Sequence, residues 1–364
     1  MLSLRPLITF NIMAILVGCG KSDTKSSPEA NPFIFRSEVS VESSINQLSS
    51  HNNTILLTNL NKVVVVDAND PDKISVTSDI TYSLPPDHAT SHSAVLSNDK
   101  QNLLVLSYIP NAFHTLDLKA PSAPVTQTLY PSTQGSTETR LKSDLRLIEN
   151  FLTMETSRIG DVVYMFAQQA ETVQGYLLAL HIYKPKEMDQ STLALGEAIP
   201  GSTFFVPSED LKKLYATDLT FRFYSFDVSN PKQPQLISKQ DRTCGSLTKD
   251  VKVIGDKLLV VTDSQFQICD LQGLDKDPIS TYAYDTTPRK KLVSFAGDKV
   301  FIATRSLGTV EAWSMKDLTN PTFLGRMIVP VANNGSIDGM EALSPSVLSV
   351  LDTEGRVRVY SIPE

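Results

Sequence analysis

An aspartate followed four residues later by a proline recurs along this chain, each time after a short apolar run. The clear copies are Asp67–Pro71, Asp117–Pro121, Asp227–Pro231 and Asp317–Pro321. In three weaker copies, the apolar run ends at Tyr183, Asp270 or Ser361. Successive copies lie about 45 residues apart, apart from one longer spacing between Asp117 and Tyr183. The period predicts seven similar structural units, the third of which carries an insertion.

The units are built from short apolar runs and show no helical pattern. The fifth unit shows this best, with runs at 247–254, 257–262, 265–269 and 278–284. Turn-forming pairs such as Gly255–Asp256 separate the runs, as expected for hairpins. Four strands in about 45 residues are typical of one propeller blade. The sequence therefore predicts an all-β fold, a seven-bladed β-propeller with four-stranded antiparallel blades.

The last unit lacks room for a fourth strand, because the chain ends at Glu364. The segment Asn31–Arg36 has the same pattern as Asn320–Arg326, which is predicted to be the fourth strand of the sixth unit. We therefore expect residues 32–38 to pair with Arg356–Ser361 and close the ring, which removes an exposed sheet edge. Residues 32–364 would then form a single domain.

The repeated aspartates have two interpretations. An Asp side chain at a turn accepts backbone N–H bonds, and the following Pro fixes φ, so the segment suits the turn between the third and fourth strands. The segment Asp67–Asp72 also looks superficially like a calcium loop, but Pro71 occupies a ligand position and no Gly supplies the sharp turn. Repetition in every blade favours the structural role.

The segment Asp227-Val-Ser-Asn-Pro-Lys-Gln-Pro-Gln-Leu-Ile resembles the LVIVD repeat of exported bacterial and archaeal β-propellers. The resemblance covers residues 32–364 and is weakest in the third unit. Other propeller families fit less well, since WD and PQQ-type repeats need a tryptophan in most blades and only Trp313 is present. The resemblance implies a fold and an exported protein, and it implies no activity.

The amino terminus is predicted to be a lipoprotein signal peptide spanning residues 1–18. It has one basic residue, Arg5, followed by an apolar run that is too short to span a bilayer as a helix. Leu16-Val17-Gly18-Cys19 resembles the bacterial lipobox, which implies lipidation of Cys19. Residues 19–31 are polar and are predicted to be a flexible tether. By the same resemblance, Gly20 favours delivery to the outer membrane, so we expect a lipid-anchored protein of the cell envelope.

Composition excludes several functions. The chain has 364 residues, of which 41% are hydrophobic and 20% charged, with a net charge of −7. An acidic chain of this kind lacks the basic surface that nucleic-acid binding requires. No phosphate-binding glycine loop, nucleophile elbow or zinc motif occurs, so we expect no cofactor, no metal and no catalytic residue. We expect a monomer.

Eight residues are candidates for partner binding, because they precede the first strands of blades and so gather on one face of the ring. A basic face on an acidic protein suits an envelope or surface protein or an anionic ligand. A solvated rim is the alternative interpretation. The residues are His88, His92, Arg140, Lys142, Arg242, Arg289, Lys290 and Lys291.

Cys244 and Cys269 fall in the same unit, one before its first strand and one at the end of its third. A rise of about 3.3 Å per residue would place them about 15–20 Å apart on opposite faces, beyond the reach of a disulfide. We therefore expect two buried free thiols.

Two functions fit the sequence. The first is a binding or scaffold module, with a protein partner docked near the insertion segments 129–140 and 168–175 of the third unit. The second is a propeller enzyme of the lactonase or hydrolase type, with polar residues at the channel mouth. Convergence of His, Asp and Glu side chains at one end of the channel would favour the enzyme.

Overall fold

The structure is a computed structural model, in which Asn31–Glu364 form one compact unit. The predicted signal peptide, Cys19 and the predicted tether lie outside the described residues. The described ranges are 33–43, 45, 47–51, 53–59, 62–82, 91–108, 111–120, 125–129, 157–168, 175–184, 187–197, 202–218, 222–241, 244, 250–273, 276–284, 291–331 and 335–362.

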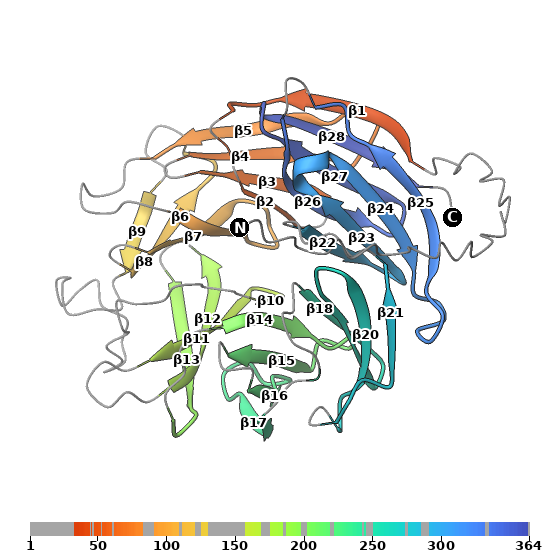
Figure 1. Ribbon diagram of the computed structural model, residues 1–364. Helices are drawn as coiled ribbons and strands as arrows, with labels where there is room; N and C mark the ends of the chain where they lie inside the picture. Colours follow the sequence, from red (N-terminus) through yellow and green to blue (C-terminus); the bar gives the residue numbers. More distant parts are fainter. Residues whose placement is uncertain are drawn as a thin grey trace, which may run out of the picture. The chain divides into compact units, whose positions relative to one another are not determined.

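The predicted seven-bladed β-propeller with four antiparallel strands per blade is confirmed. In each sheet the strands are hydrogen-bonded to their neighbours in antiparallel order, and the first strand lies toward the middle of the ring (Figure 1). Blades 1 to 3 contain β2 (Gln47–His51), β3 (Thr54–Thr58), β4 (Lys62–Asp67), β5 (Ser75–Thr81), β6 (Ser91–Leu96), β7 (Asn102–Tyr108), β8 (Asn111–Asp117), β9 (Val125–Leu129), β10 (Ser157–Ile159), β11 (Val162–Gln168), β12 (Gly175–Lys184) and β13 (Glu187–Ala194).

The other four blades follow the same order, and one short 3-10 helix, η1 (Arg305–Leu307), connects two strands of blade 6. Blades 4 to 7 contain β14 (Ser202–Pro207), β15 (Lys213–Asp218), β16 (Phe223–Asp227), β17 (Gln235–Gln240), β18 (Asp250–Ile254), β19 (Lys257–Val261), β20 (Gln265–Asp270), β21 (Ser280–Ala283), β22 (Lys291–Ala296), β23 (Lys299–Thr304), β24 (Thr309–Ser314), β25 (Thr322–Ile328), β26 (Ile337–Ser344), β27 (Val347–Asp352), β28 (Arg356–Ser361) and β1 (Ile34–Ser40).

The amino-terminal strand β1 closes the ring. It pairs antiparallel with β28, in a register that runs from Ile34 opposite Ser361 to Ser40 opposite Arg356. Side chains of β1 also reach the turn of blade 1, since the Ser37 hydroxyl donates to the Pro71 carbonyl at 2.5 Å. The predicted pairing is therefore confirmed. It joins the two ends of the folded unit in one sheet.

Packing between neighbouring blades explains why the middle strands are almost wholly apolar. Strand β3 is buried along its whole length, because each of its faces contacts a different neighbouring sheet. On one side, Ile55 and Leu57 pack against Val357 and Val359 of blade 7. The sequence of a strand that is buried on both faces is a continuous run of apolar residues. The fourth strands cover the outside of the ring and are more exposed, as in β5.

The predicted role of the repeated aspartates is confirmed at five blades. In each of these five blades, an aspartate at the end of the third strand, or shortly after it, accepts a hydrogen bond from the backbone N–H two residues later, at 2.8–3.0 Å. The Ser229 hydroxyl also donates to Asp227 and lowers the pKa of that carboxyl, although the side chain is exposed. The five residues are Asp67, Asp117, Asp227, Asp270 and Asp317.

The expectation of two free thiols is wrong. Cys244 and Cys269 form a disulfide, with a distance of 6.1 Å between their Cα atoms. The error came from placing the ends of all strands on two flat faces. Strands in a sheet twist progressively, so the chain that leaves the outermost strand of blade 4 crosses toward blade 5. Accordingly, the Gln240 side chain at the end of β17 donates to the Leu271 carbonyl at 3.5 Å, two residues beyond Cys269.

This disulfide is expected to stabilise the propeller. It lies between blades 4 and 5 and closes a loop with a sequence separation of 25 residues. Such a loop contributes about 3 kcal/mol by restricting the unfolded chain. The double variant Cys244→Ser, Cys269→Ser should therefore have a free energy of unfolding lower by about 2–4 kcal/mol in urea titrations. Alkylation of the unreduced, denatured wild type should leave both cysteines unmodified, and labelling of both would contradict the disulfide.

A second prediction concerns the contact that fixes the end of β1. Gly355 has φ +74°, and a Cβ atom there would lie 2.6 Å from the Val41 carbonyl oxygen. Gly255 is the matched control, because it has φ +58° and open space around it. Both changes to Ala should cost about 1–2 kcal/mol for the left-handed backbone. Gly355→Ala should cost a further 1–3 kcal/mol through the clash, measured by urea unfolding. If both variants lose the same free energy of unfolding, the contact between Gly355 and Val41 does not fix the end of β1.

Candidate functional site

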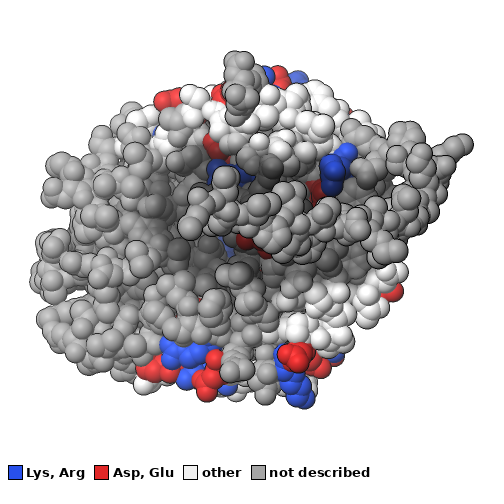
Figure 2. Space-filling model, in the orientation of Figure 1, with Lys and Arg blue, Asp and Glu red and all other residues white. Residues whose placement is uncertain are grey.

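The candidate site is the channel enclosed by the first strands of the blades. Two cavities along these strands share Ser49 of β2 and Ala94 of β6, so they lie next to each other. In Figure 2, acidic and basic side chains are visible in the hollow at the middle of the view. The two cavities differ in charge, and we call them the acidic chamber and the basic chamber.

The acidic chamber has a volume of about 370 Å³ and lies where the first strands begin. Its polar residues are two acids, one amide and two hydroxyl side chains, and its other lining residues are mainly apolar. The lining residues are Gln47, Leu48, Ser49, Thr58, Ala94, Leu292, Val293, Asp338, Gly339, Met340 and Glu341. None of these described lining residues is basic. Asp338 is already paired with Arg305, at 2.8 Å.

Glu341 is the acid of this chamber without an ion-pair partner. It lies in the middle of β26, where its Oε2 atom accepts a hydrogen bond from the Ser294 hydroxyl of β22 at 3.3 Å. The Ser294 oxygen in turn accepts the backbone N–H of Ala342 at 2.9 Å, which fixes the hydroxyl between the two strands. Among the described residues, no basic side chain contacts Glu341. Burial raises the pKa of Glu341 to about 7, and the Ser294 hydrogen bond opposes this shift.

The basic chamber has a volume of about 410 Å³ and lies at the opposite ends of the same strands. Arg158 of β10 and His51 of β2 both line it. The Nη2 atom of Arg158 donates to the Asn98 side chain at 2.6 Å, and its Nε donates to the Gly160 carbonyl at 2.5 Å. Burial, together with the positive charge of Arg158, lowers the pKa of His51. His51 is therefore held in its neutral form at pH 7.

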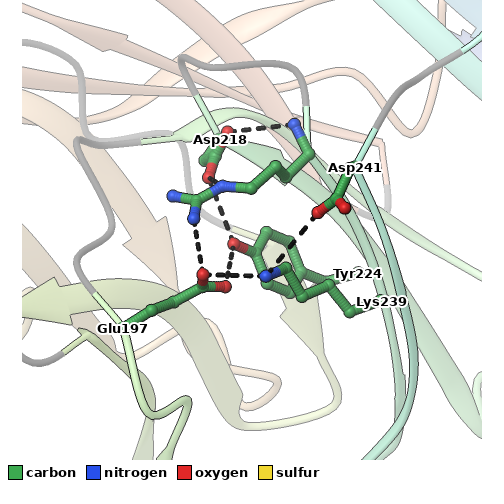
Figure 3. A network of polar contacts seen from close by, with 6 residues as sticks. Glu197, Asp218, Tyr224, Lys239 and Asp241 are labelled. Carbon is green, nitrogen blue, oxygen red and sulfur yellow. Dashed lines mark hydrogen bonds and ion pairs between the residues drawn. The ribbon is translucent and has the colours of Figure 1, made fainter.

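A network of charged groups connects the strands of blade 4 (Figure 3). The Asp218 carboxylate is fully buried and accepts bonds from Arg222 Nε at 2.6 Å and from the Tyr224 hydroxyl at 3.1 Å. Glu197 pairs with Arg222 at 2.6 Å and with Lys239 at 2.7 Å. Burial alone would raise the pKa of Glu197, but the Lys239 hydrogen bond and the Arg222 charge outweigh it and lower the pKa. Every acid of this network is paired, which indicates a structural role.

Blade 7 contains a similar buried pair. Asp352 ends β27 and accepts a bond from Arg358 Nη1 at 2.7 Å, while Arg358 Nε also contacts Glu38 of β1 at 3.1 Å. In both blades, the acid also accepts the backbone N–H four residues later, at 3.0 Å. These acids therefore hold the turn between the second and third strands. Glu341 differs from them because it faces a cavity and lacks a cationic partner.

The residues proposed from sequence cannot be brought together in one described site. Two of the eight lie in first strands, His92 in β6 and Lys291 in β22, although the structure describes only their backbone. The remaining six lie outside the described residues, as does most of both insertion segments. Sequence reasoning missed Glu341, Arg158 and His51. The only sequence signal that could have identified these residues was a charged or titratable side chain within a predicted first strand.

Within the described ranges, no group of three or more His, Cys, Asp or Glu side chains could hold a metal ion. No helix there is long and apolar enough to cross a membrane.

The unpaired Glu341 should make stability depend on pH. Its pKa rises from about 4.5 to about 7 on folding, so folding binds a proton between these values and stability falls as pH increases through them. Glu341→Gln should therefore raise the free energy of unfolding by about 2–3 kcal/mol at pH 8 and have little effect at pH 4. Urea unfolding at both pH values measures this. A variant that is less stable than wild type at pH 8 would contradict the unpaired acid.

Comparisons with known proteins support the fold. No protein-family model matches the chain, and no curated protein matches it. Among solved structures, Raptor from Chaetomium thermophilum has a TM-score of 0.61 at 11% identity, and the match covers 91% of this chain and 29% of the Raptor chain. This protein therefore spans less than a third of that chain's length.

Two further solved structures are matched over their whole length. The Cps50 (Swd1) β-propeller domain from Myceliophteria thermophila has a TM-score of 0.56 at 14% identity, over 91% of this chain and 100% of that one. A chain of the mitotic checkpoint complex has a TM-score of 0.59 at 10% identity, over 98% of this chain and 100% of that one. At these identities, the comparisons show that the chain has the β-propeller fold.

Proposed function

We propose that this protein is a binding or scaffold module of the cell envelope, anchored by a lipid on Cys19, with a protein partner. The closed ring around a two-chambered channel carries this proposal. A rigid ring of sheets presents the connecting loops of all blades on two faces, and such surfaces suit binding. The basic residues that precede the first strands, together with the insertion of the third blade, remain the proposed docking face.

The known neighbours support a protein partner by analogy of fold. One matched chain belongs to a structure described as a mitotic checkpoint complex, which is a protein assembly. Fold alone does not determine function, so the analogy supports the class of function and no particular partner.

The anchor is supported by the amino-terminal sequence. A basic residue, a short apolar run and Leu16-Val17-Gly18-Cys19 occur in the order of a lipoprotein signal peptide. The Asp227–Pro231 turn, which resembles the LVIVD repeat of exported propellers, has the hydrogen bonds expected of a structural repeat. Outer-membrane delivery, proposed from Gly20, is part of the same hypothesis.

An enzyme is the second candidate, and Glu341 is the observation that favours it. A carboxyl with a pKa of about 7 can act as a general acid or base at neutral pH. The described part of the chamber offers no His or Lys that would complete an acid–base pair. A binding site therefore requires no residues beyond those described, whereas an acid–base catalytic site would require a second catalytic group. Hydrolysis of a panel of lactones and esters that is lost in Glu341→Gln would instead support the enzyme.

The anchor is tested at Cys19. The Cys19→Ala variant should lose labelling by a clickable fatty acid and should remain unprocessed or appear in the soluble fraction, because the thiol that receives the lipid is absent. Ser22→Ala, three residues away in the proposed tether, is the matched control and should label as wild type does. Undiminished labelling of Cys19→Ala would contradict the anchor.

The docking face is tested in the same cells. Crosslinking of wild type, followed by mass spectrometry, should recover a partner protein. Shortening residues 131–139 to a four-residue turn should reduce that recovery, provided that urea unfolding shows an intact fold. Unchanged recovery would place the partner on another surface and overturn the proposed face.

A further inference from the structure

We propose that the acidic chamber binds the head of an organic cation, an ammonium or a guanidinium group, with Glu341 as its counter-charge. The inference deepens the proposed binding function, on which it rests, by naming the chemistry of the ligand that enters the channel. Its basis is the position of one carboxyl in a cavity whose described walls supply no positive charge.

The walls of the chamber are close-packed and preformed. Strand β26 packs against both β2 and β22. At Gly339, an added Cβ atom would lie 2.6 Å from the Leu48 Cβ atom, so only glycine allows β2 and β26 to approach this closely. The resulting volume of about 370 Å³ falls in the range of small-ligand sites. A ligand of a few atoms, or the end of one side chain, fits this space.

The lining suits a cation on a short apolar stem. Glu341 supplies the charge, and Gln47, Ser49 and Thr58 supply oxygen atoms that can accept N–H bonds. The Thr58 hydroxyl already donates to Gln47 Oε1 at 3.1 Å, which orients the amide. Leu292, Val293 and Met340 provide apolar contacts on the other side. Hydrogen bonds between an ammonium or guanidinium and a carboxylate are among the strong ones.

The other charged groups on the elements around β26 leave Glu341 without compensation. On η1, Arg305 is bound to Asp338 at 2.8 Å, and on β27, Asp352 is bound to Arg358 at 2.7 Å. His51 lies at the opposite end of β2 and lines the basic chamber. Two lysines remain on these elements. Lys299 of β23 is not among the groups that shift the pKa of Glu341. At Lys291 of β22 only the backbone is described.

A divalent metal ion fits this chamber less well than an organic cation. Calcium takes six to eight oxygen ligands, and magnesium requires nearly ideal octahedral geometry. The described chamber offers one unpaired carboxylate, one amide and two hydroxyls, and half of its lining is apolar. An organic cation needs one counter-charge and a few acceptors, which is what these residues supply.

Binding should strengthen as pH rises. A cation binds the ionised carboxylate, and ionisation of Glu341 occurs near pH 7 because burial raises its pKa to about 7. Below that pH, each unit should weaken binding about tenfold, since the ligand must displace a proton. Above it, affinity should be constant.

The test is calorimetric titration of the purified folded chain with n-butylguanidinium, with butanol and butyrate as neutral and anionic probes. At pH 8, wild type should bind the guanidinium more tightly than either other probe. Glu341→Gln should weaken this binding at least tenfold, while Glu354→Gln, which removes an acid paired with Arg356 on the same blade, should not. At pH 5.5, wild-type binding should fall at least tenfold. Equal binding by Glu341→Gln, preference for butyrate, or no binding would each overturn the inference.

Peptides distinguish the two sources of such a head group. If the N-acetylated, C-amidated peptide Gly-Gly-Lys-Gly-Gly binds and the same blocked peptide with Gln in place of Lys does not, the ligand is a basic side chain of a partner protein. If only the small cation binds, the ligand is a free organic cation, and the inference again holds. If wild type binds no cation while the crosslinking experiment still recovers a partner protein, this inference is overturned and the proposed function stands.

Discussion

The pairing of β1 with β28 is the interaction on which the rest of the structure depends. It joins residues 34–40 to residues 356–361, and so it converts a row of sheets into a closed ring. An open row would leave β28 as an exposed edge and would leave the apolar faces of the last sheet without a neighbour. With the ring closed, blade 7 packs against blade 1 through Val357, Val359, Ile55 and Leu57. The first strands then surround a channel that no single blade could form.

Closure also explains where the charged groups lie. At the turns between second and third strands, Asp218 and Asp352 are buried with arginine partners, and they hold the turns in place. In the channel, the position of Glu341 follows from the meeting of β26 with β22, and burial there raises its pKa to about 7. The same packing that completes the ring therefore creates an acid whose charge is not compensated by the described residues. The uncompensated charge of ionised Glu341 destabilises the folded state, and a ligand that supplies a positive charge would offset this cost. Stability and ligand binding are therefore linked at Glu341.

The fold was predictable because its signals are local and repeated. The Asp turns recur with one period, and each is stabilised within two residues, as at Asp227 and Asp317. The closing strand was predictable because the seventh unit lacked a fourth strand, and residues 32–38 had a strand pattern but belonged to no unit. The disulfide was not, because the path from Gln240 to Cys269 depends on the twist of two sheets. The burial of Glu341 was not predictable either. An acidic residue in a strand is normally expected to face solvent, and its burial here depends on how the first strands of the blades surround the channel.

Hydrogen exchange with mass spectrometry tests ring closure most directly. The account predicts that amides of β1, residues 34–40, are protected to the same degree as those of β28 and β27, because all belong to one closed sheet. Protection should be lost from the three strands together as urea is added. Rapid exchange of β1 in the native protein, with β28 and β27 still protected, would show that the ring is not closed by this strand and would contradict the account.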